Sequence, residues 1–238
     1  MTDPLLIWSY LESGPLLWLT ATLVAYWIGD RIFRLSHGKP WFNPVLLSVI
    51  ALGALLLATG TPYETYFEGA QFVHFMLGPA TVSLALPLHA NLRRVRKAAL
   101  PMALALLAGS LTAVVSALGL AWMLGADFGL LASLAPKSAT APVAIGISEK
   151  LGGDPSMTAV LVLLTGMIGA IAVTPMLNVL GLRDWRGRGF ATGVAAHGVG
   201  TARALQVHPT AGAFAGIGMG MNAVLTGLIA PLVLQLFR

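Results

Sequence analysis

The sequence contains no cysteine and very few charged residues. Of its 238 residues, only 10% are Asp, Glu, Lys or Arg, whereas 57% are hydrophobic. Soluble domains carry roughly 25% charged residues, so this composition excludes a soluble enzyme and a disordered regulator. The absence of cysteine excludes thiol catalysis, disulfides and cysteine-ligated metals. With a mean hydropathy of +0.82, the chain is predicted to be an integral membrane protein with several spans.

The hydrophobic residues form long runs separated by short polar segments. We predict an all-α polytopic protein with about seven helical membrane elements in a single transmembrane domain, residues 1–238. The 27 glycines and 14 prolines indicate close helix packing and broken helices. The expected membrane elements are Pro15–Leu35, Pro44–Ala58, Ala70–Asn91, Ala98–Leu124, Asp127–Leu151, Met157–Leu180, Gly189–Leu205 and Gly212–Phe237.

The net charge of +5 is best interpreted as an orientation signal, because most basic residues lie at the ends of the apolar runs. The clusters after the first run and at 93–97 are expected on the cytoplasmic side. The loop with Arg183, Arg186 and Arg188 joins that side only if Asp127–Leu151 enters the membrane and returns. The sequence favours this re-entrant topology, with a crossing broken helix as the alternative. Asp30 and Arg34, four residues apart, are expected to pair.

Two of the expected elements are interrupted by proline. Ala70–Asn91 is broken at Leu77–Thr81, and Asp127–Leu151 is broken at Pro136–Pro142. Similar strings follow the two breaks, ATVSLAL at 80–86 and ATAPVAI at 139–145. This echo is consistent with an internal repeat, the pattern of transporters in which paired broken helices bind substrate near the midplane. The alternative is two unrelated proline-kinked helices.

Lys137 is the first candidate for a functional site. It lies inside a hydrophobic run, close to the hydroxyls of Ser133, Ser138 and Thr140. A lysine at the bilayer centre costs about 2.5–3.5 kcal/mol on insertion scales, so a lysine without a role is not expected there. The helix break also frees backbone N–H groups, which together with Lys137 would bind a small anion. The alternative is a lysine that extends to the interface from a re-entrant tip.

Arg203 is the second candidate, in the segment HGVGTAR at 197–203. A guanidinium binds a carboxylate through two parallel hydrogen bonds. Gly198 and Gly200 would let a ligand or another backbone approach closely. The alternative is that Arg203 lies near a helix end and forms an ordinary ion pair.

Other polar residues are weaker candidates. His197 could exchange a proton with a substrate pathway, or it could be a neutral core histidine with one hydrogen bond. Thr81, Thr201 and Asn222 are candidate substrate contacts, although hydrogen bonding between helices is the ordinary role of such residues.

Several patterns are missing. No Asp or Glu lies within several residues of the two breaks, so a cation site is not expected. The metalloprotease, nucleophile-elbow and P-loop motifs are absent, and we expect neither an enzyme nor a bound cofactor or metal.

Two long segments carry a family resemblance. The run PKSATAPVAIGISEKLGGDPSMTAVLVLLTGMIGA at 136–170, followed by GFATGVAAHGVGTARALQ at 189–206, resembles the LrgB/CidB (YohK-like) family of membrane proteins. The segment YFEGAQFVHFMLGPATVSLALPLHANL at 66–92 is similar to an earlier signature of that family. The family's motif residues fall here on Lys137, Ser138, His197, Gly198, Gly200, Thr201 and Arg203.

The resemblance implies transport or permeability in the cell (inner) membrane. Family members are associated with a small holin-like partner of the LrgA/CidA type and with control of murein hydrolase activity and lysis. Others, including a related plastidic glycolate/glycerate translocator, carry small monocarboxylates such as pyruvate or glycolate. We therefore predict a monocarboxylate carrier in which Lys137 and Arg203 hold the carboxylate, helped by the hydroxyls of Ser138, Thr140 and Thr201. The alternative is a holin-like regulator of lysis without a defined substrate.

Overall fold

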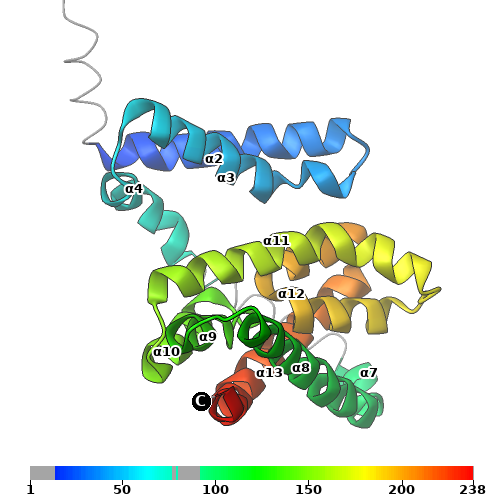
Figure 1. Cartoon of the computed structure of the whole chain (residues 1–238). Helices are drawn as coiled ribbons and strands as arrows, with labels where there is room; N and C mark the ends of the chain where they lie inside the picture. Colours follow the sequence, from blue (N-terminus) through cyan, green and yellow to red (C-terminus); the bar gives the residue numbers. More distant parts are fainter. Residues whose placement is uncertain (1–13, 77–78, 80–91, 238) are drawn as a thin grey trace, which may run out of the picture. The chain divides into compact units, whose positions relative to one another are not determined.

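The computed structural model describes residues 14–76, 79 and 92–237, and every regular element in these residues is helical (Figure 1). The chain divides into two compact units, Met1–Ser83 and Leu84–Arg238. We describe each unit by itself. The expectation of one transmembrane domain over the whole chain stays a prediction.

The first unit contains helices α2 (Pro15–Leu35), α3 (Pro44–Thr59) and α4 (Tyr63–Phe75), with a short 3-10 helix at Pro40–Phe42. Helix α3 begins where the side chain of Asn43 accepts hydrogen bonds from the first free backbone N–H groups. Trp18 on α2 is buried and packs edge-on against Tyr66 of α4. The predicted pair of Asp30 and Arg34 is confirmed, with Arg34 Nε 2.7 Å from Asp30 Oδ2.

The second unit contains the remaining helices. In chain order they are α7 (Leu92–Lys97), α8 (Ala99–Met123), α9 (Phe128–Leu134), α10 (Ala141–Leu151), α11 (Pro155–Val179), α12 (Trp185–Val207) and α13 (Pro209–Leu234), followed by a 3-10 helix at Gln235–Phe237.

The predicted spans agree closely with these helices. Among the described residues, four helices are long and apolar enough to cross a bilayer: α2, α8, α11, and α13 with its 3-10 extension. Each lies within three residues of a range predicted from hydropathy. The part of Ala70–Asn91 that was predicted to break lies outside the described residues.

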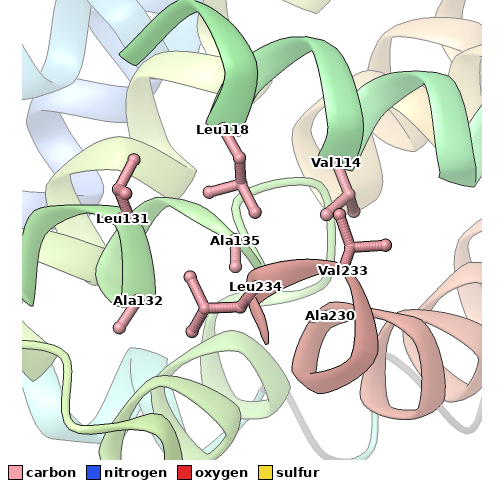
Figure 2. Packing of buried hydrophobic residues seen from close by; sticks show 8 residues of the cluster. All are labelled: Val114, Leu118, Leu131, Ala132, Ala135, Ala230, Val233 and Leu234. Carbon is pink, nitrogen blue, oxygen red and sulfur yellow. The ribbon is translucent and has the colours of Figure 1, made fainter. Parts of the chain in front are cut away.

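A core of small and branched side chains joins α8, α9 and α13. Leu118, Leu131 and Ala230 are at most 1% exposed, and Figure 2 shows the cluster converging between the three helices. The complete set is Val114, Leu118, Leu131, Ala132, Ala135, Ala230, Val233 and Leu234. Because lipid is as apolar as these side chains, their contribution comes from close packing and not from removal of water.

The course of the chain in the second unit bears on the re-entrant topology expected for Asp127–Leu151, which stays a prediction. Helix α8 runs from α7 toward the α9–α10 segment, and α11 runs back again (Figure 1). Lys97, which precedes α8, and Arg186, which follows α11, line the same cavity. If α8 and α11 both cross the bilayer, their basic ends lie on the same side, and the segment between them starts and ends on the other side. Helices α9 and α10, with 7 and 11 residues, are each too short to cross.

Buried hydroxyls hold this hairpin against α11. Thr158 Oγ1 on α11 donates to Ser148 Oγ on α10 at 2.7 Å, and Ser133 Oγ on α9 accepts from the backbone N–H of Asp154 at 2.8 Å. Gly153 lies so close to Ser133 that an added Cβ would be 2.7 Å from its backbone nitrogen. These contacts fix the two short helices although neither has a long apolar face.

Helices α12 and α13 pack with their backbones nearly in contact. A Cβ added to Gly189 or Gly193 would overlap the backbone of Ala211 or Ala215. A Cβ on Gly218 would be 2.6 Å from the carbonyl oxygen of Phe190. Small residues at these positions allow the close approach that the abundance of glycine indicated.

Candidate functional site

The first element of the site is the predicted break between α9 and α10. Helix α9 ends at Leu134, and α10 begins at Ala141, after the non-helical N-cap residue Thr140. Pro136 cannot donate a backbone hydrogen bond, which explains why α9 ends before it, whereas Pro142 lies in the first turn of α10, where a missing N–H is tolerated. The break at Pro136–Pro142 is therefore confirmed, and it contains Lys137 and Ser138.

The second element is a break inside α12, which the sequence analysis treated as one helix. Ala196 has φ −127° and ψ 18°, and His197 has φ 40° and ψ −132°, so the helix is interrupted between Ala195 and Gly198. A positive φ is strained for histidine, by about 1–3 kcal/mol, and the surrounding contacts must hold it. The described part of the chain thus contains two broken helices, of which only the first was predicted.

Asn222 on α13 connects the first break to α8. Its Nδ2 donates to the carbonyl oxygen of Ser138 at 3.0 Å, and its Oδ1 accepts from Ser110 Oγ on α8 at 2.5 Å. Asn222 and Ser110 are each 1% exposed. The asparagine therefore satisfies a carbonyl group in the break and fixes its position relative to two spanning helices.

The two breaks meet at α11, where Val162 packs against Ala139 of the first break and its carbonyl oxygen faces His197 of the second. The Nζ atom of Lys137 is 3.3 Å from Ser138 Oγ, and the lysine is only partly buried. His197 Nε2 is 2.9 Å from the carbonyl oxygen of Val162 on α11. Because a carbonyl oxygen only accepts, Nε2 carries the hydrogen of this bond. The structure thus brings the two breaks together at α11.

Each break is followed by the start of a helical segment. Helix α10 begins after Thr140, whose side chain makes no capping hydrogen bond, and the second half of α12 begins after His197. The first N–H groups of a helix have no partner within it, and the dipole gives that end a partial positive charge. Together with Lys137, these two ends give the junction a positive potential suited to an anion.

Arg203 lies in a different place. It is 7% exposed and borders a small cavity together with Arg188 and Thr192, and Lys137 is not among the described residues around that cavity. Arg188 crosses from α12 to the end of α11, where its Nη1 donates to the carbonyl oxygen of Leu182 at 2.8 Å. The predicted placement of Lys137 and Arg203 around one carboxylate is therefore not seen at this cavity.

The remaining predicted residues are distributed around the α12 break. Thr201 Oγ1 donates to the carbonyl oxygen of His197 at 2.7 Å, so the hydroxyl satisfies a group that the break leaves free. Gly200 is buried, and an added Cβ would be 2.5 Å from Ala196 Cβ, whereas Gly198 is exposed. Thr81 lies outside the described residues. None of these positions has been tested as a substrate contact, and all stay predictions.

Three groups that build the site were not identified as site residues from the sequence. They are Ser110, the carbonyl oxygen of Val162, and Arg188. Ser110 and Asn222 are 112 residues apart, and no local pattern pairs them. A backbone carbonyl leaves no signal in the sequence at all.

The helices and their two central breaks define a class of protein: a multi-pass helical membrane protein with a polar junction inside the bundle. The comparisons with known proteins identify the family. The LrgB-like family model matches residues 22–236, and the chain belongs to this family. It is therefore a multi-pass cell membrane protein.

The chain is similar to several relatives over nearly its whole length. It is 38% identical to the uncharacterized protein YxaC of Bacillus subtilis (strain 168), over 91% of this chain and 94% of the relative. It is 31% identical to the holin-like protein CidB of Staphylococcus epidermidis, over 96% of this chain and 99% of the relative. No solved structure matches.

Proposed function

We propose that this protein is a holin-like component of the cell membrane that controls membrane permeability, together with a small partner of the LrgA/CidA type. The observation that supports the proposal is the similarity to holin-like CidB, because the alignment covers 96% of this chain and 99% of the relative. Such an alignment includes the spanning helices and both breaks. Control of murein hydrolase activity and of lysis would follow from the change in permeability.

A second function is favoured by the central junction: transport of a small monocarboxylate such as pyruvate, lactate or glycolate. The specific observation is Lys137, which lies in the break between α9 and α10 with its Nζ atom 3.3 Å from Ser138 Oγ. A lysine inside a membrane protein is expensive and ordinarily marks an ion or substrate pathway. Two helical segments that begin at the same junction add positive potential, which is the arrangement that broken-helix transporters use for anions.

In this second function the carboxylate would be held by the ammonium of Lys137 and by N–H groups at the start of α10 and of the second half of α12. The hydroxyls of Ser138 and Thr140 would bind the remaining oxygens. Asn222 would keep the break in position through Ser138 and would not itself contact the anion. Arg203 would bind the same carboxylate only at another step of transport, because Lys137 is not among the described residues around the cavity that Arg203 borders here. Neither function requires catalysis.

Reconstitution separates the two functions. Purified protein is placed in liposomes with and without its LrgA/CidA-type partner, and uptake of labelled pyruvate, lactate and glycolate is measured beside leakage of an inert dye. A carrier gives saturable uptake that falls at least tenfold in Lys137→Gln and persists in Lys150→Gln, which alters an exposed lysine. Absence of saturable uptake under all conditions contradicts the carrier.

The holin-like function is tested in cells. A strain that lacks the gene is compared with the same strain carrying the wild-type chain or Asn222→Ala, and detergent-induced lysis and membrane potential are recorded. We expect the wild-type chain to change both and Asn222→Ala to lose the effect. Lysis and potential that do not respond to the wild-type chain, with the partner present, refute this function.

A further inference from the structure

A large groove lies between α8, α11 and the first half of α12, away from the two breaks for most of its length. Its volume is about 750 Å³, within the range of about 300–1,000 Å³ that small-molecule sites occupy. Small side chains form much of its wall, among them Ala105, Ala172, Ala191 and Ala195, all of them exposed. Elsewhere α8 presents large side chains such as Leu104 and Leu107 to its surroundings. The groove is therefore a local hollow in an apolar surface.

The charged residues of the groove are gathered at one end. Lys97 directly precedes the span α8, and Asp184 and Arg186 directly follow the span α11. Arg186 also pairs with Asp184 at 2.7 Å, so this end carries one net positive charge from the three residues that line it. Arg93 and Arg96, which precede Lys97 in the sequence and are exposed, add to the positive field. The other end, near Ala113 and Gly169, is apolar.

The groove is also longer than one leaflet of the hydrocarbon core is thick. It follows α8 from Lys97 to Ala113, a rise of about 24 Å at about 1.5 Å per residue. One leaflet of the hydrocarbon core is about 15 Å thick, half of the usual core of about 30 Å. An acyl chain that starts at the basic end thus fits into the groove without crossing the midplane. A bundle helix from another protein would instead need apolar contacts along its whole length, including at the charged end.

We propose that this groove binds one anionic phospholipid of the phosphatidylglycerol type, with its phosphate at Lys97 and Arg186 and one acyl chain along Ala105 and Ala172. Clusters of Lys and Arg next to a span attract anionic headgroups, and basic pockets between spanning helices bind them specifically. The proposal does not depend on either function proposed above. It assigns the residues 93–97 a binding role in addition to orientation.

Native mass spectrometry of the purified full chain tests the headgroup. Palmitoyl-oleoyl phosphatidylglycerol is compared with phosphatidylcholine that has the same acyl chains. One phosphatidylglycerol should bind at least about fivefold more tightly than phosphatidylcholine, since each basic residue near the headgroup contributes about that factor. Lys97→Gln and Arg186→Gln should each remove most of this preference, and Lys39→Gln should retain it. Equal binding of the two lipids by the wild-type chain overturns the proposal.

A matched pair of alanines on α8 tests the acyl chain. Ala105 lines the groove, and Ala108 is exposed but is not among its lining residues. Ala105→Leu should weaken binding of both lipids about tenfold, whereas Ala108→Leu should leave it unchanged, with thermal unfolding recorded to show that both variants fold. A photoactivatable phosphatidylglycerol with its diazirine in the acyl chain should label α8, α11 and α12 in the wild-type chain. Labelling of other helices overturns the proposal. A change of oligomeric state in Ala105→Leu but not in Ala108→Leu also overturns it, because the groove would then be an interface with a second copy of the chain.

Discussion

The side-chain amide of Asn222 donates to the carbonyl oxygen of Ser138 at 3.0 Å, across 84 residues of sequence. This one hydrogen bond connects the last spanning helix to the break that contains Lys137. The same asparagine accepts from Ser110, so three elements depend on a single buried side chain.

Replacement of Asn222 by alanine should therefore destabilise the protein. The substitution removes the amide that bonds the Ser138 carbonyl and the Ser110 hydroxyl, both of which are buried. We expect the free energy of unfolding to fall by about 1–3 kcal/mol. We expect a lower thermal midpoint in detergent and a weaker function in either assay described above. Asn178→Ala, at an exposed position at the end of α11, is the control and should unfold like the wild-type chain. Equal midpoints for the two variants would show that the buried hydrogen bonds contribute nothing measurable.

The positive φ of His197 allows the break in α12 to be tested by comparing two substitutions at this position. Both His197→Ala and His197→Gly remove the hydrogen bond to Val162, but only glycine adopts φ 40° without strain. We expect His197→Gly to be more stable than His197→Ala by about 1 kcal/mol, measured by thermal unfolding. The usual order on a continuous helix is the reverse, because glycine costs about 1 kcal/mol relative to alanine there. Alanine as the more stable variant would contradict the break in α12.

The packing of α12 on α13 gives a second matched pair. A Cβ on Gly193 would overlap the backbone of Ala215, whereas a Cβ on Gly187 meets nothing within 4 Å. Gly193→Ala should lose about 1–3 kcal/mol of stability through forced separation of the helices. Gly187→Ala should be neutral or gain up to about 1 kcal/mol, because alanine favours a helix. Thermal unfolding of the two variants in the same detergent measures the difference, and equal stability would mean that the two helices do not approach this closely.

Asp184 lies outside the spanning helices and should make stability depend on pH. Hydrogen bonds from the side chain and backbone of Arg186 hold the pKa of Asp184 below its ordinary value. The stabilisation is therefore complete above the ordinary pKa of aspartate, about 3.9, and is lost as the pH falls through the lower pKa of the folded state. Asp184→Asn retains an N-cap, so its thermal midpoint should fall less than that of the wild-type chain between neutral pH and about pH 3.

Asp184→Ala supplies the control for the cap. It removes the acceptor of the Arg186 backbone N–H, 2.9 Å from Asp184 Oδ1, and should lower stability by about 1 kcal/mol at neutral pH. Because the pair with Arg186 is exposed, the ionic contribution is expected to be small beside that of the cap. If the thermal midpoint of Asp184→Asn falls as steeply between neutral pH and about pH 3 as that of the wild-type chain, Asp184 does not contribute to the loss of stability in acid.

Hydropathy and proline positions predicted most of the fold. The span Pro15–Leu35 was placed at its observed bounds, since apolar length and a flanking glycine and proline determine a spanning helix locally. The break at Pro136–Pro142 followed from the chemistry of proline. The re-entrant course of Asp127–Leu151 was a preference based on the basic loops, and it stays a prediction.

The α12 break and the hydrogen bonds of Asn222 were not predictable in the same way. Ala196 and His197 are ordinary helix residues, and the positive φ of His197 depends on contacts with α11 that are distant in sequence. The placement of Arg203 has the same origin. The sequence motifs name both residues, Lys137 and Arg203, whereas the tertiary structure places Arg203 beside the same cavity as Arg188 and Lys137 in the break after α9.

The short helices α9 and α10 have a consequence for membrane insertion. A segment of 7 or 11 helical residues is too short to be stable across a bilayer alone, so these two helices depend on neighbours that are already inserted. Their buried partners, Thr158 on α11 and Asn222 on α13, are made later by the ribosome. The segment with Lys137 therefore gains its full set of buried hydrogen-bond partners only after the last spanning helix has been made.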